Sequence, residues 1–565
     1  MKKLLFLFSL AFAGFAFGPE ALAQGQARKH FIYFKDKQNT PFTFHNPEAY
    51  LSPRALERRA RQNISLTERD LPVNPTYAQN LKAAGAQVWY TSKWFNGAVV
   101  HCDSTVLQAL RQLPFVEGSQ TLNRVSNPLS TNSARGSNAT SASATSSKNK
   151  KANQAPVMKK TNTAEDYGGS FHQANMIGAV DMHAAGFRGE GMLIAILDGG
   201  FSRVNQIPAF SHLFTHNQIK TTYNFIERNT EVYQRDSHGT MVLSTMAAYQ
   251  PGSFIGTAYK ADYCLFITED TRSEHNIEEI NWLLAAEYAD SAGVDIINSS
   301  LGYNTFDAPS SSYSYRDMDG FTALVSKAAD LASSVGILVV TSAGNEGTSD
   351  WRYISAPADA KSVLAVGAVD SLGNKSGFSS FGPSADGRVK PDLVAMGGRS
   401  YVINPNGTIV RANGTSFSGP ILAGMVAGYW QANRHLKNAE VIEHLKRSGS
   451  RASTPDNNVG YGIPSFSRAV LLGEGRIDTP DKPIGLYPNP LREEQLSLVL
   501  NQKYLNKNVG VRFYDLLGKL VHQENILAAN TENLLSVPAS SFSKGMYLCL
   551  VTGKDSPRTI KLLKL

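Results

Sequence analysis

The sequence has 565 residues, of which 42% are hydrophobic and 18% charged, enough apolar material for several globular domains with large cores. The formal net charge is +8, but lysine and arginine are scattered and form no single stripe, so this charge favours solubility over nucleic-acid binding. The cysteines Cys102, Cys264 and Cys549 are far apart and odd in number, which argues against a disulfide framework. We expect each to pack as a small apolar residue, with one disulfide pair as the alternative.

The first residues have the three parts of a secretory signal peptide. Lys2 and Lys3 are followed by an apolar run from Leu4 to Phe17 and by the small-residue site Ala21-Leu22-Ala23. We therefore expect residues 1–23 to be a signal peptide that is cleaved after Ala23. No later apolar run is long enough to span a bilayer, so we expect an exported mature protein.

Residues 24–122 alternate strands and helices in the order of a split βαβ unit. The expected strands are His30–Phe34, Gln87–Tyr90, Ala98–Cys102 and Phe115–Gly118, and the expected helices are Thr76–Ala84 and Thr105–Gln112. This order predicts a ferredoxin-like α+β domain, with an additional basic helical stretch at Pro53–Gln62. Residues 123–162 are rich in Ser, Thr, Asn and Lys and cannot bury enough surface to fold, so we expect a flexible linker there.

The largest region, residues 163–475, alternates apolar strand runs with helical runs. The expected strands are Met192–Leu197, Asp262–Ile267, Val294–Asn298, Gly336–Thr341 and Ser362–Val366, and the expected helices are Gly239–Tyr249, Ile277–Ala292, Phe321–Ser334 and Gly419–Gln431. This pattern predicts an α/β domain with a largely parallel sheet and functional residues at the carboxyl ends of its strands. In residues 476–565 we expect a small all-β sandwich with strands at Leu496–Leu500, Gly510–Tyr514, Met546–Val551 and Thr559–Leu563.

Three chemically active side chains occur at turns of the α/β region. Asp198 follows the apolar run Leu193–Leu197, His238 begins a helical run, and Ser416 lies in the small-residue turn Asn413–Pro420. Asp, His, Ser is one known chain order of the serine triad, in which serine attacks a carbonyl, histidine takes its proton and aspartate orients the imidazole. Each turn alone is also typical of an ordinary loop, but their joint occurrence on α/β elements indicates catalysis.

A fourth group, Asn345, follows the predicted strand at Ile337–Thr341. Its side-chain amide and the backbone N–H of Ser416 are the expected donors to the oxyanion that develops on a substrate carbonyl. The sequence contains no cluster of zinc ligands and no phosphate-binding loop, so we predict neither a cofactor nor a metal site, with calcium left open.

Residues from about 167 to 467 resemble a subtilisin-like serine protease of the subtilase family. The resemblance is carried by Leu193–Gly200, His238-Gly239-Thr240, Asn298–Gly302, Ser342–Asn345, Phe378–Gly382, Lys390-Pro391-Asp392 and Gly414–Pro420. It implies a three-layer catalytic domain that hydrolyses peptide bonds through an acyl-enzyme intermediate. It also implies that the substrate backbone pairs with Ser299, Ser300, Leu301 and Gly302 as an added strand.

The resemblance places the primary specificity pocket between this substrate segment and Ser342, Ala343 and Gly344, with Ser355 at its floor. None of these segments contains a carboxylate, so we predict a preference for apolar or uncharged side chains, although Glu346 or Asp350 could reach the pocket from the neighbouring loop.

Two departures from the family pattern affect the prediction. Gly199 stands where many relatives have Thr or Ser, so a hydroxyl that could support Asp198 is missing and the carboxylate should be held less rigidly. The insertion Tyr303–Gly320 carries Asp307, Asp317 and Asp319. We expect it to be a solvated loop, with a cap over the substrate cleft or a calcium site as the alternatives.

The flanking regions also resemble known modules. Residues 24–122 resemble an inhibitory, chaperone-like propeptide, and the tail, with Tyr487-Pro488-Asn489-Pro490 and Gly545-Met546-Tyr547, resembles the sorting domain of the type IX secretion system of certain Gram-negative bacteria. The leading interpretation is an exported serine endopeptidase made as a zymogen, secreted or attached to the cell surface. Its expected partners are protein or peptide substrates, its own propeptide and the outer-membrane secretion machinery. The alternative is a catalytically silent peptide-binding protein with the same fold.

Overall fold

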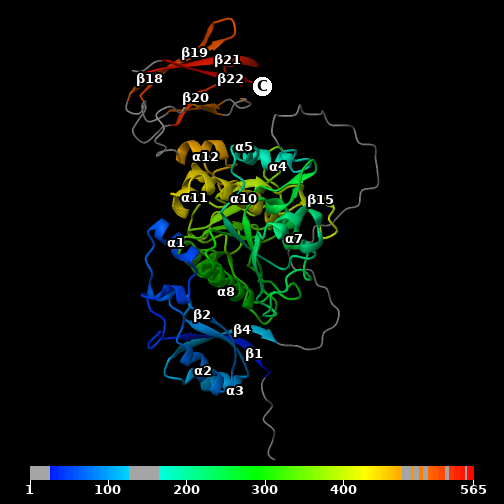
Figure 1. The fold of residues 1–565 in the computed structure, drawn as a ribbon, viewed down its shortest axis with the longest axis vertical. Coiled ribbons are helices and arrows are strands. Elements are labelled where there is room, and N and C mark those ends of the chain that lie inside the picture. Colours follow the sequence, from blue (N-terminus) through cyan, green and yellow to red (C-terminus); the bar gives the residue numbers. More distant parts are fainter. Residues whose placement is uncertain are drawn as a thin grey trace, which may run out of the picture. The chain divides into compact units, whose positions relative to one another are not determined.

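The computed structural model describes residues 26–125, 165–473, 485–487, 491, 495–500, 507–527, 534–553 and 557–564 (Figure 1). The chain divides into two compact units, Met1–Pro41 with Leu71–Thr131, and Phe42–Asp70 with Asn132–Leu565. The predicted signal peptide and almost all of the predicted linker lie outside the described residues. No helix in the described part of the chain is long and apolar enough to cross a membrane.

The first unit has the predicted ferredoxin-like fold. Its strands are β1 (Arg28–Phe34), β2 (Gln87–Ser92), β3 (Gly97–Cys102) and β4 (Val116–Val125), and its helices are α2 (Pro75–Ala83) and α3 (Ser104–Arg111). The strands form one antiparallel sheet in the order β2-β3-β1-β4. Asn74 and Asp103 start the helices by accepting the backbone N–H groups of Thr76 and Val106.

The predicted basic helix is present as α1 (Pro53–Gln62), but it folds with the second unit and not with this sheet. Ser52 caps its start by accepting the N–H of Ala55, and Asn63 ends it in the left-handed conformation. The short 3-10 turns Pro47–Ala49 and Glu68–Asp70 flank α1.

The centre of the second unit is a seven-stranded parallel sheet in the order β13-β12-β11-β10-β5-β9-β6. The strands are β5 (Leu193–Asp198), β6 (Ile219–Asn224), β9 (Asp262–Ile267), β10 (Ile296–Ser299), β11 (Leu338–Ser342), β12 (Leu364–Val369) and β13 (Leu393–Met396). The two edge strands β6 and β13 were not predicted. β6 is only partly buried and polar, and β13 has four residues, so neither has the long apolar run that marks a central strand.

Helices cover both faces of this sheet, as a three-layer fold requires. α7 (His238–Ala247) and α10 (Thr415–Ala432) pack on one face, in a core with Ile194, Ile196 and Val340. α8 (Ile277–Ala292) and α9 (Leu324–Ser334) pack against each other and cover the other face, where α8 contacts β5 and α9 contacts β11. The remaining elements are α4 (Phe171–Met176), α5 (Ala179–Ala184), α6 (Ser211–Thr215), α11 (Asn438–Arg447), α12 (Phe466–Gly473), β7 (Tyr249–Gln250), β8 (Phe254–Ile255), β14 (Ser400–Ile403) and β15 (Ile409–Ala412).

The C-terminal region is all-β, as predicted. One sheet has the order β16-β17-β20 and the other β19-β18-β21-β22. Their bounds are β16 (Gly485–Tyr487), β17 (Gln495–Val499), β18 (Asn508–Asp515), β19 (Leu520–Leu527), β20 (Leu534–Pro538), β21 (Gly545–Thr552) and β22 (Arg558–Lys564). In β18 the buried residues Val509, Val511 and Phe513 alternate with half-buried ones, the period that a two-layer β-structure needs.

All three cysteines are buried free thiols, which confirms the prediction that they pack as apolar residues. Burial raises the pKa of Cys264 to about 12, so this thiol stays protonated and unreactive.

Candidate active site

Asp198 ends β5, near the middle of the parallel sheet, and its side chain is fully buried. The carboxylate accepts the backbone N–H of Gly199 at 2.8 Å and lies 3.0 Å, through either oxygen, from Nδ1 of His238. A Cβ on Gly199 would lie 3.0 Å from the methyl group of Thr271, so that neighbour already fills the space beside this residue. Residue 199 supports the carboxylate through its backbone N–H alone, and the looser hold on Asp198 stays a prediction.

His238 is the first residue of α7, and its backbone N–H donates to Asp236 at 2.7 Å. Burial acts to lower the pKa of the His238 imidazole, but the charge and hydrogen bond of Asp198 outweigh it and raise the pKa above its ordinary value. The pair therefore favours an imidazole that takes up a proton, which is the property of a general base.

Ser416 is the second residue of α10, which begins four residues before the predicted helix start at Gly419. Gly414 precedes the helix with a φ of 156°, a conformation that L side chains rarely adopt, and this allows the sharp entry. The Ser416 hydroxyl donates to the carbonyl of Ser300 at 3.3 Å, and the ring of His238 lies 6.0 Å from the ring of Phe417. In the described chain no hydrogen bond joins Ser416 to His238, so their direct contact stays a prediction.

Ser300 and Ser416 are connected in a second way. Pro420 lies inside α10 and has no N–H, so the carbonyl of Ser416 cannot receive the usual helical hydrogen bond from the residue four positions later. The hydroxyl of Ser300 donates to this carbonyl at 2.9 Å. Ser300 therefore replaces the missing helical donor and ties the first turn of α10 to the end of β10.

The amide of Asn345 has a defined orientation. Its Oδ1 accepts the backbone N–H of Thr415 at 2.8 Å and the Thr415 hydroxyl at 3.0 Å. A backbone N–H only donates, so the atom facing it must be Oδ1 and the other end of the amide must be the Nδ2 donor. Within the described residues, Nδ2 makes no hydrogen bond. The backbone N–H of Ser416 lies in the first turn of α10, where N–H groups have no helical acceptor. This N–H and Nδ2 of Asn345 are therefore two free donors at the candidate site.

The predicted substrate-binding residues lie on adjacent strand ends, with different accessibility. Ser299 and Ser300 are buried, and the hydroxyl of Ser299 accepts the indole N–H of Trp282 at 3.0 Å. Leu301 is half-buried and Gly302 is exposed, so the accessible part of this segment is its second half.

The residues predicted to line the specificity pocket also lie close to one another. Ser342 donates its hydroxyl to the carbonyl of Leu301 at 3.1 Å, and the carbonyl of Ala343 accepts the N–H of Ser355 at 3.3 Å. A Cβ on Gly302 would lie 3.2 Å from Cβ of Ser355, and one on Gly344 would lie 3.3 Å from its hydroxyl. Ser355 therefore lies between these two predicted segments.

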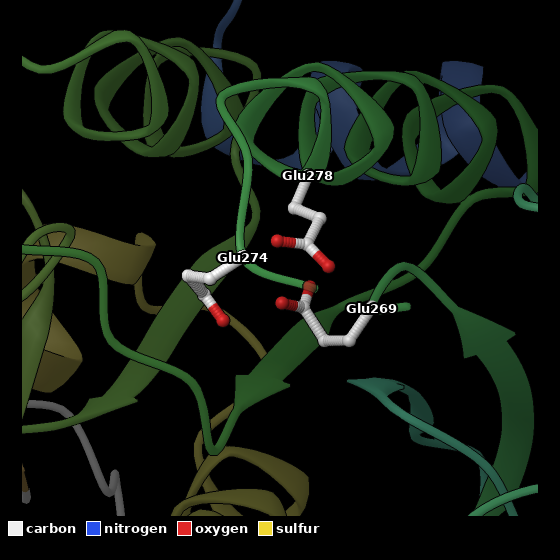
Figure 2. A group of neighbouring side chains, drawn as sticks. All are labelled: Glu269, Glu274 and Glu278. Atoms are coloured by element: carbon white, nitrogen blue, oxygen red, sulfur yellow. The ribbon is translucent and has the colours of Figure 1, made fainter. Parts of the chain in front are cut away.

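An acidic cluster beside this region was missed. Glu269 lies just after β9, Glu274 is on the following loop and Glu278 is in the first turn of α8 (Figure 2). One carboxylate oxygen of each lies within 4.8 Å of the others, the kind of oxygen cluster that could hold a metal ion. A signal was present in the sequence, because five of the eleven residues 269–279 are acidic.

The cluster also has a structural role that does not depend on a metal ion. Glu278 accepts the N–H groups of Asp270 at 2.7 Å and His275 at 3.0 Å, which closes the loop onto the helix start. Burial raises the pKa of Glu269 to about 7, and burial with the charge of Glu269 raises the pKa of Glu274 to about 9. Neighbouring carboxylates are compatible here because protons reduce their repulsion.

The insertion Tyr303–Gly320 is a loop with most of its residues at least partly exposed, as expected, but it is anchored by buried side chains that were not predicted. Tyr303, Phe306 and Met318 are buried. The hydroxyl of Tyr303 donates to Glu269 at 2.6 Å, and that of Tyr313 donates to Glu279 at 2.8 Å. Its aromatic side chains thus attach it to the acidic residues around the start of α8.

The three aspartates of the insertion accept backbone N–H groups. Asp307 accepts the N–H of Glu274 at 3.1 Å, Asp317 accepts that of Ser314 at 2.7 Å, and Asp319 accepts that of Phe321 at 2.7 Å. In the part of the chain that the structure describes, the group of acidic residues with metal-binding spacing is the one at Glu269, Glu274 and Glu278, and it includes none of these aspartates.

Comparison with known proteins finds matches to three successive regions of the chain. Residues 29–141 match the model of the Peptidase S8 propeptide domain of Bacteroidota, residues 189–462 match the Subtilase family, and residues 485–564 match a secretion system C-terminal sorting domain. The chain is 31% identical over 293 residues to subtilisin NAT of Bacillus subtilis subsp. natto, which covers 51% of this chain and 67% of the relative. It is 31% identical over 281 residues to a subtilisin of Bacillus pumilus, covering 49% and 90%, and 30% identical over 289 residues to subtilisin BL of Lederbergia lenta, covering 51% and 94%.

Proposed function

The chain belongs to the subtilase family of serine endopeptidases, and from this premise we propose that Asp198, His238 and Ser416 are its catalytic triad. The observation that carries the proposal is the Asp198–His238 contact of 3.0 Å at the carboxyl end of β5. Parallel sheets of α/β domains bind ligands at this end of their strands. The oriented amide of Asn345 at the first turn of α10 adds support.

The reaction follows from the chemistry of these groups. The Ser416 oxygen forms a bond to the scissile carbonyl carbon, and its proton passes to Nε2 of His238, while Asp198 stabilises the resulting imidazolium. The N–H of Ser416 and Nδ2 of Asn345 donate to the oxyanion. The C–N bond then breaks, the leaving amine takes the proton from His238, and a water molecule repeats the sequence to release the acyl group.

The chain is an exported protease with a propeptide domain and a C-terminal sorting domain. We infer that the propeptide inhibits the enzyme and assists its folding, and that the zymogen is cut within residues 123–162. We further infer that residues 1–23 direct the chain to the periplasm. On this proposal, residues 476–565 engage an outer-membrane secretion machinery of the type IX kind, which leaves the protein secreted or attached to the cell surface.

Covalent labelling with an organophosphate tests the triad directly. The processed protein should gain one label, at Ser416, and Ser416→Ala should abolish both labelling and peptide hydrolysis. Ser418→Ala is a matched control, because Ser418 lies two residues further along α10 and donates its hydroxyl to the carbonyl of Thr415. A folded protein that binds peptides but takes up no label would instead support the catalytically silent alternative.

A further inference from the structure

Residues Phe42–Asp70, here called the α1 segment, show a mismatch between sequence family and structure. They lie inside the stretch that matches the propeptide model, residues 29–141, yet they fold as part of the second compact unit. The segment lies against the ends of α8 and α9 and the start of β10. Figure 1 shows α1 beside α8. Its own backbone takes part, because the N–H of Ser52 donates to the carbonyl of Ser291 at 2.9 Å.

The first set of contacts is a buried ion-pair network centred on Asp290. Arg58 Nη2 lies 2.5 Å from one oxygen of Asp290, and Arg59 Nη1 lies 2.8 Å from the same oxygen. Arg59 is also 2.8 Å from Asp70, within the segment itself. The side chains of Arg58 and Asp290 are 1% and 0% exposed, so water can replace neither partner. Each charge is therefore stabilised by buried protein partners and not by water.

A second set of contacts is centred on Asp295, which precedes β10. Arg54 and Arg61 of the segment pair with Asp295, Arg61 at 3.2 Å, and Arg434 pairs with it at 3.3 Å from beyond the end of α10. Asp295 also accepts the N–H of Leu193, the first residue of β5, at 3.0 Å. The segment thus contacts a carboxylate that already connects two central strands.

The segment also donates hydrogen bonds to backbone carbonyls at the carboxyl ends of two helices. Arg58 donates to the carbonyl of Val294 at 2.7 Å, just after α8, and to that of Val335 at 3.1 Å, just after α9. Gln62 donates to the carbonyl of Gly336 at 2.7 Å. Helix carboxyl ends carry unpaired carbonyls and partial negative charge, so arginine side chains stabilise them.

The fit at these helix ends is close. Gly293 and Gly336 both have left-handed backbone, and a Cβ on either would lie 2.7 Å from atoms of the segment, the N–H nitrogen of Ala55 and the amide nitrogen of Gln62. Gln62 also accepts the backbone N–H of Asn438 at 3.0 Å, which ties the segment to α11. These contacts are those of a packed interior.

The position of the segment separates it from the catalytic residues. It contacts the residues around the amino end of β5, near Leu193, whereas Asp198 is at the carboxyl end of the same strand. Five residue steps of about 3.3 Å put roughly 17 Å between these ends. Bound here, the α1 segment leaves the residues proposed for catalysis uncovered.

We propose that the α1 segment remains bound to the catalytic domain as a permanent structural part of the active enzyme after the rest of the propeptide unit has been removed. The proposal rests on the proposed function only in that an active enzyme is formed by propeptide removal. The α1 segment is then a non-covalently held chain, and complete propeptide removal needs cuts on both sides of it in addition to the cut in the linker.

The first experiment does not depend on catalytic activity, so its result tests this proposal even if the proposed function is wrong. In the full chain carrying Ser416→Ala, recognition sites for a sequence-specific protease are inserted between Phe44 and His45 and between Ser65 and Leu66. Phe44, His45 and Ser65 are exposed, and the sites enclose all of α1. After complete cutting, peptide 45–65 should co-elute with the protein on size exclusion in 1 M NaCl and separate only on denaturation, because buried pairs are little screened by salt. Elution of the free peptide under native conditions would overturn the proposal.

Matched variants show whether the buried network holds the peptide. Arg58→Ala should speed its release by about 100-fold or more, since it leaves Asp290 without one of its buried partners. Glu57→Ala changes a neighbouring side chain that is 75% exposed and should leave the release rate unchanged. If Arg58→Ala does not fold, Gln62→Ala takes its place, with faster release again expected. Equal release from all variants would contradict the assigned contacts.

The second experiment examines the active enzyme. Wild-type protein is titrated with an organophosphate to count active sites and is then denatured for peptide mapping by mass. Peptides from residues 45–62 should be present at one copy per active site, whereas peptides from residues 76–122 should be absent. A fully active enzyme without residues 45–62 would refute the proposal.

Discussion

Ser300 and Pro420 both determine which donor reaches the carbonyl of Ser416, and this allows a quantitative prediction. Ser300→Ala should remove the donor to the Ser416 carbonyl and leave a buried acceptor unsatisfied, because Pro420 has no N–H to replace it. An unsatisfied buried group costs about 1–3 kcal/mol of unfolding free energy. In a Pro420→Ala background the new N–H lies four residues after Ser416 and donates to the same carbonyl, so Ser300→Ala should cost about 1–2 kcal/mol less there. The hydrogen bond that Nδ2 of Asn298 donates to the Ser300 hydroxyl is lost in both backgrounds and cancels in the comparison. The expected coupling energy is about 1–2 kcal/mol.

The assay is urea unfolding of the four members of this double-mutant cycle, all carrying Ser416→Ala so that self-cleavage cannot interfere. Ser334→Ala is the matched control: its hydroxyl donates to the carbonyl of Leu331 at 2.7 Å at an exposed helix end, where water can replace it. This control should change the unfolding free energy by less than about 0.5 kcal/mol. Additive effects of Ser300→Ala and Pro420→Ala would refute the reasoning, because they would mean that the two residues do not serve the same carbonyl.

Four further outcomes are expected. Asn345→Ala should lower kcat by about 10²- to 10³-fold with little change in KM, the general cost of removing one oxyanion donor; a change mainly in KM would assign Asn345 to substrate binding. Burial raises the pKa of Glu269 to about 7, from an ordinary 4.5, so the folded state binds this proton more tightly than the unfolded state and stability falls as pH rises from about 4.5 through 7. Urea unfolding at pH 5 and pH 8 should show a loss of up to about 3 kcal/mol that Glu269→Gln reduces; an equal loss in the variant would place its origin elsewhere, for example in Glu274. On a peptide library the mature enzyme should prefer apolar or uncharged side chains before the scissile bond, because Ser355 and the segments around it are uncharged, and dominant cleavage after Lys or Arg would contradict this. Deletion of residues 487–565 should leave peptide hydrolysis intact but retain the protein in the periplasm, and export of the truncated chain at the normal level would remove the sorting hypothesis.

Local pattern predicted the central elements of the fold. The apolar run before Asp198, the helix start at His238 and the turn before Ser416 each lie within one stretch of chain, so hydrophobic period and turn chemistry indicate them directly. The edge strand β6 was missed because its partly exposed, polar residues resemble a loop when considered alone. For the insertion Tyr303–Gly320, the serines and aspartates correctly indicated exposure to solvent. The anchoring of buried Tyr303 and Phe306 was not predicted, because it depends on residues distant in sequence.

By itself, the sequence determined the α/β order of the catalytic domain, the residue types proposed for its chemistry and their places at strand and helix ends, because these depend on neighbours along the chain. Only the tertiary structure decided which end of the Asn345 amide is free, which hydroxyl serves the Ser416 carbonyl, and that the α1 segment packs on α8. Each of these depends on a partner more than sixty residues away in sequence. Buried polar and charged groups must find such partners, and the pairing is set by packing in space rather than by local propensity.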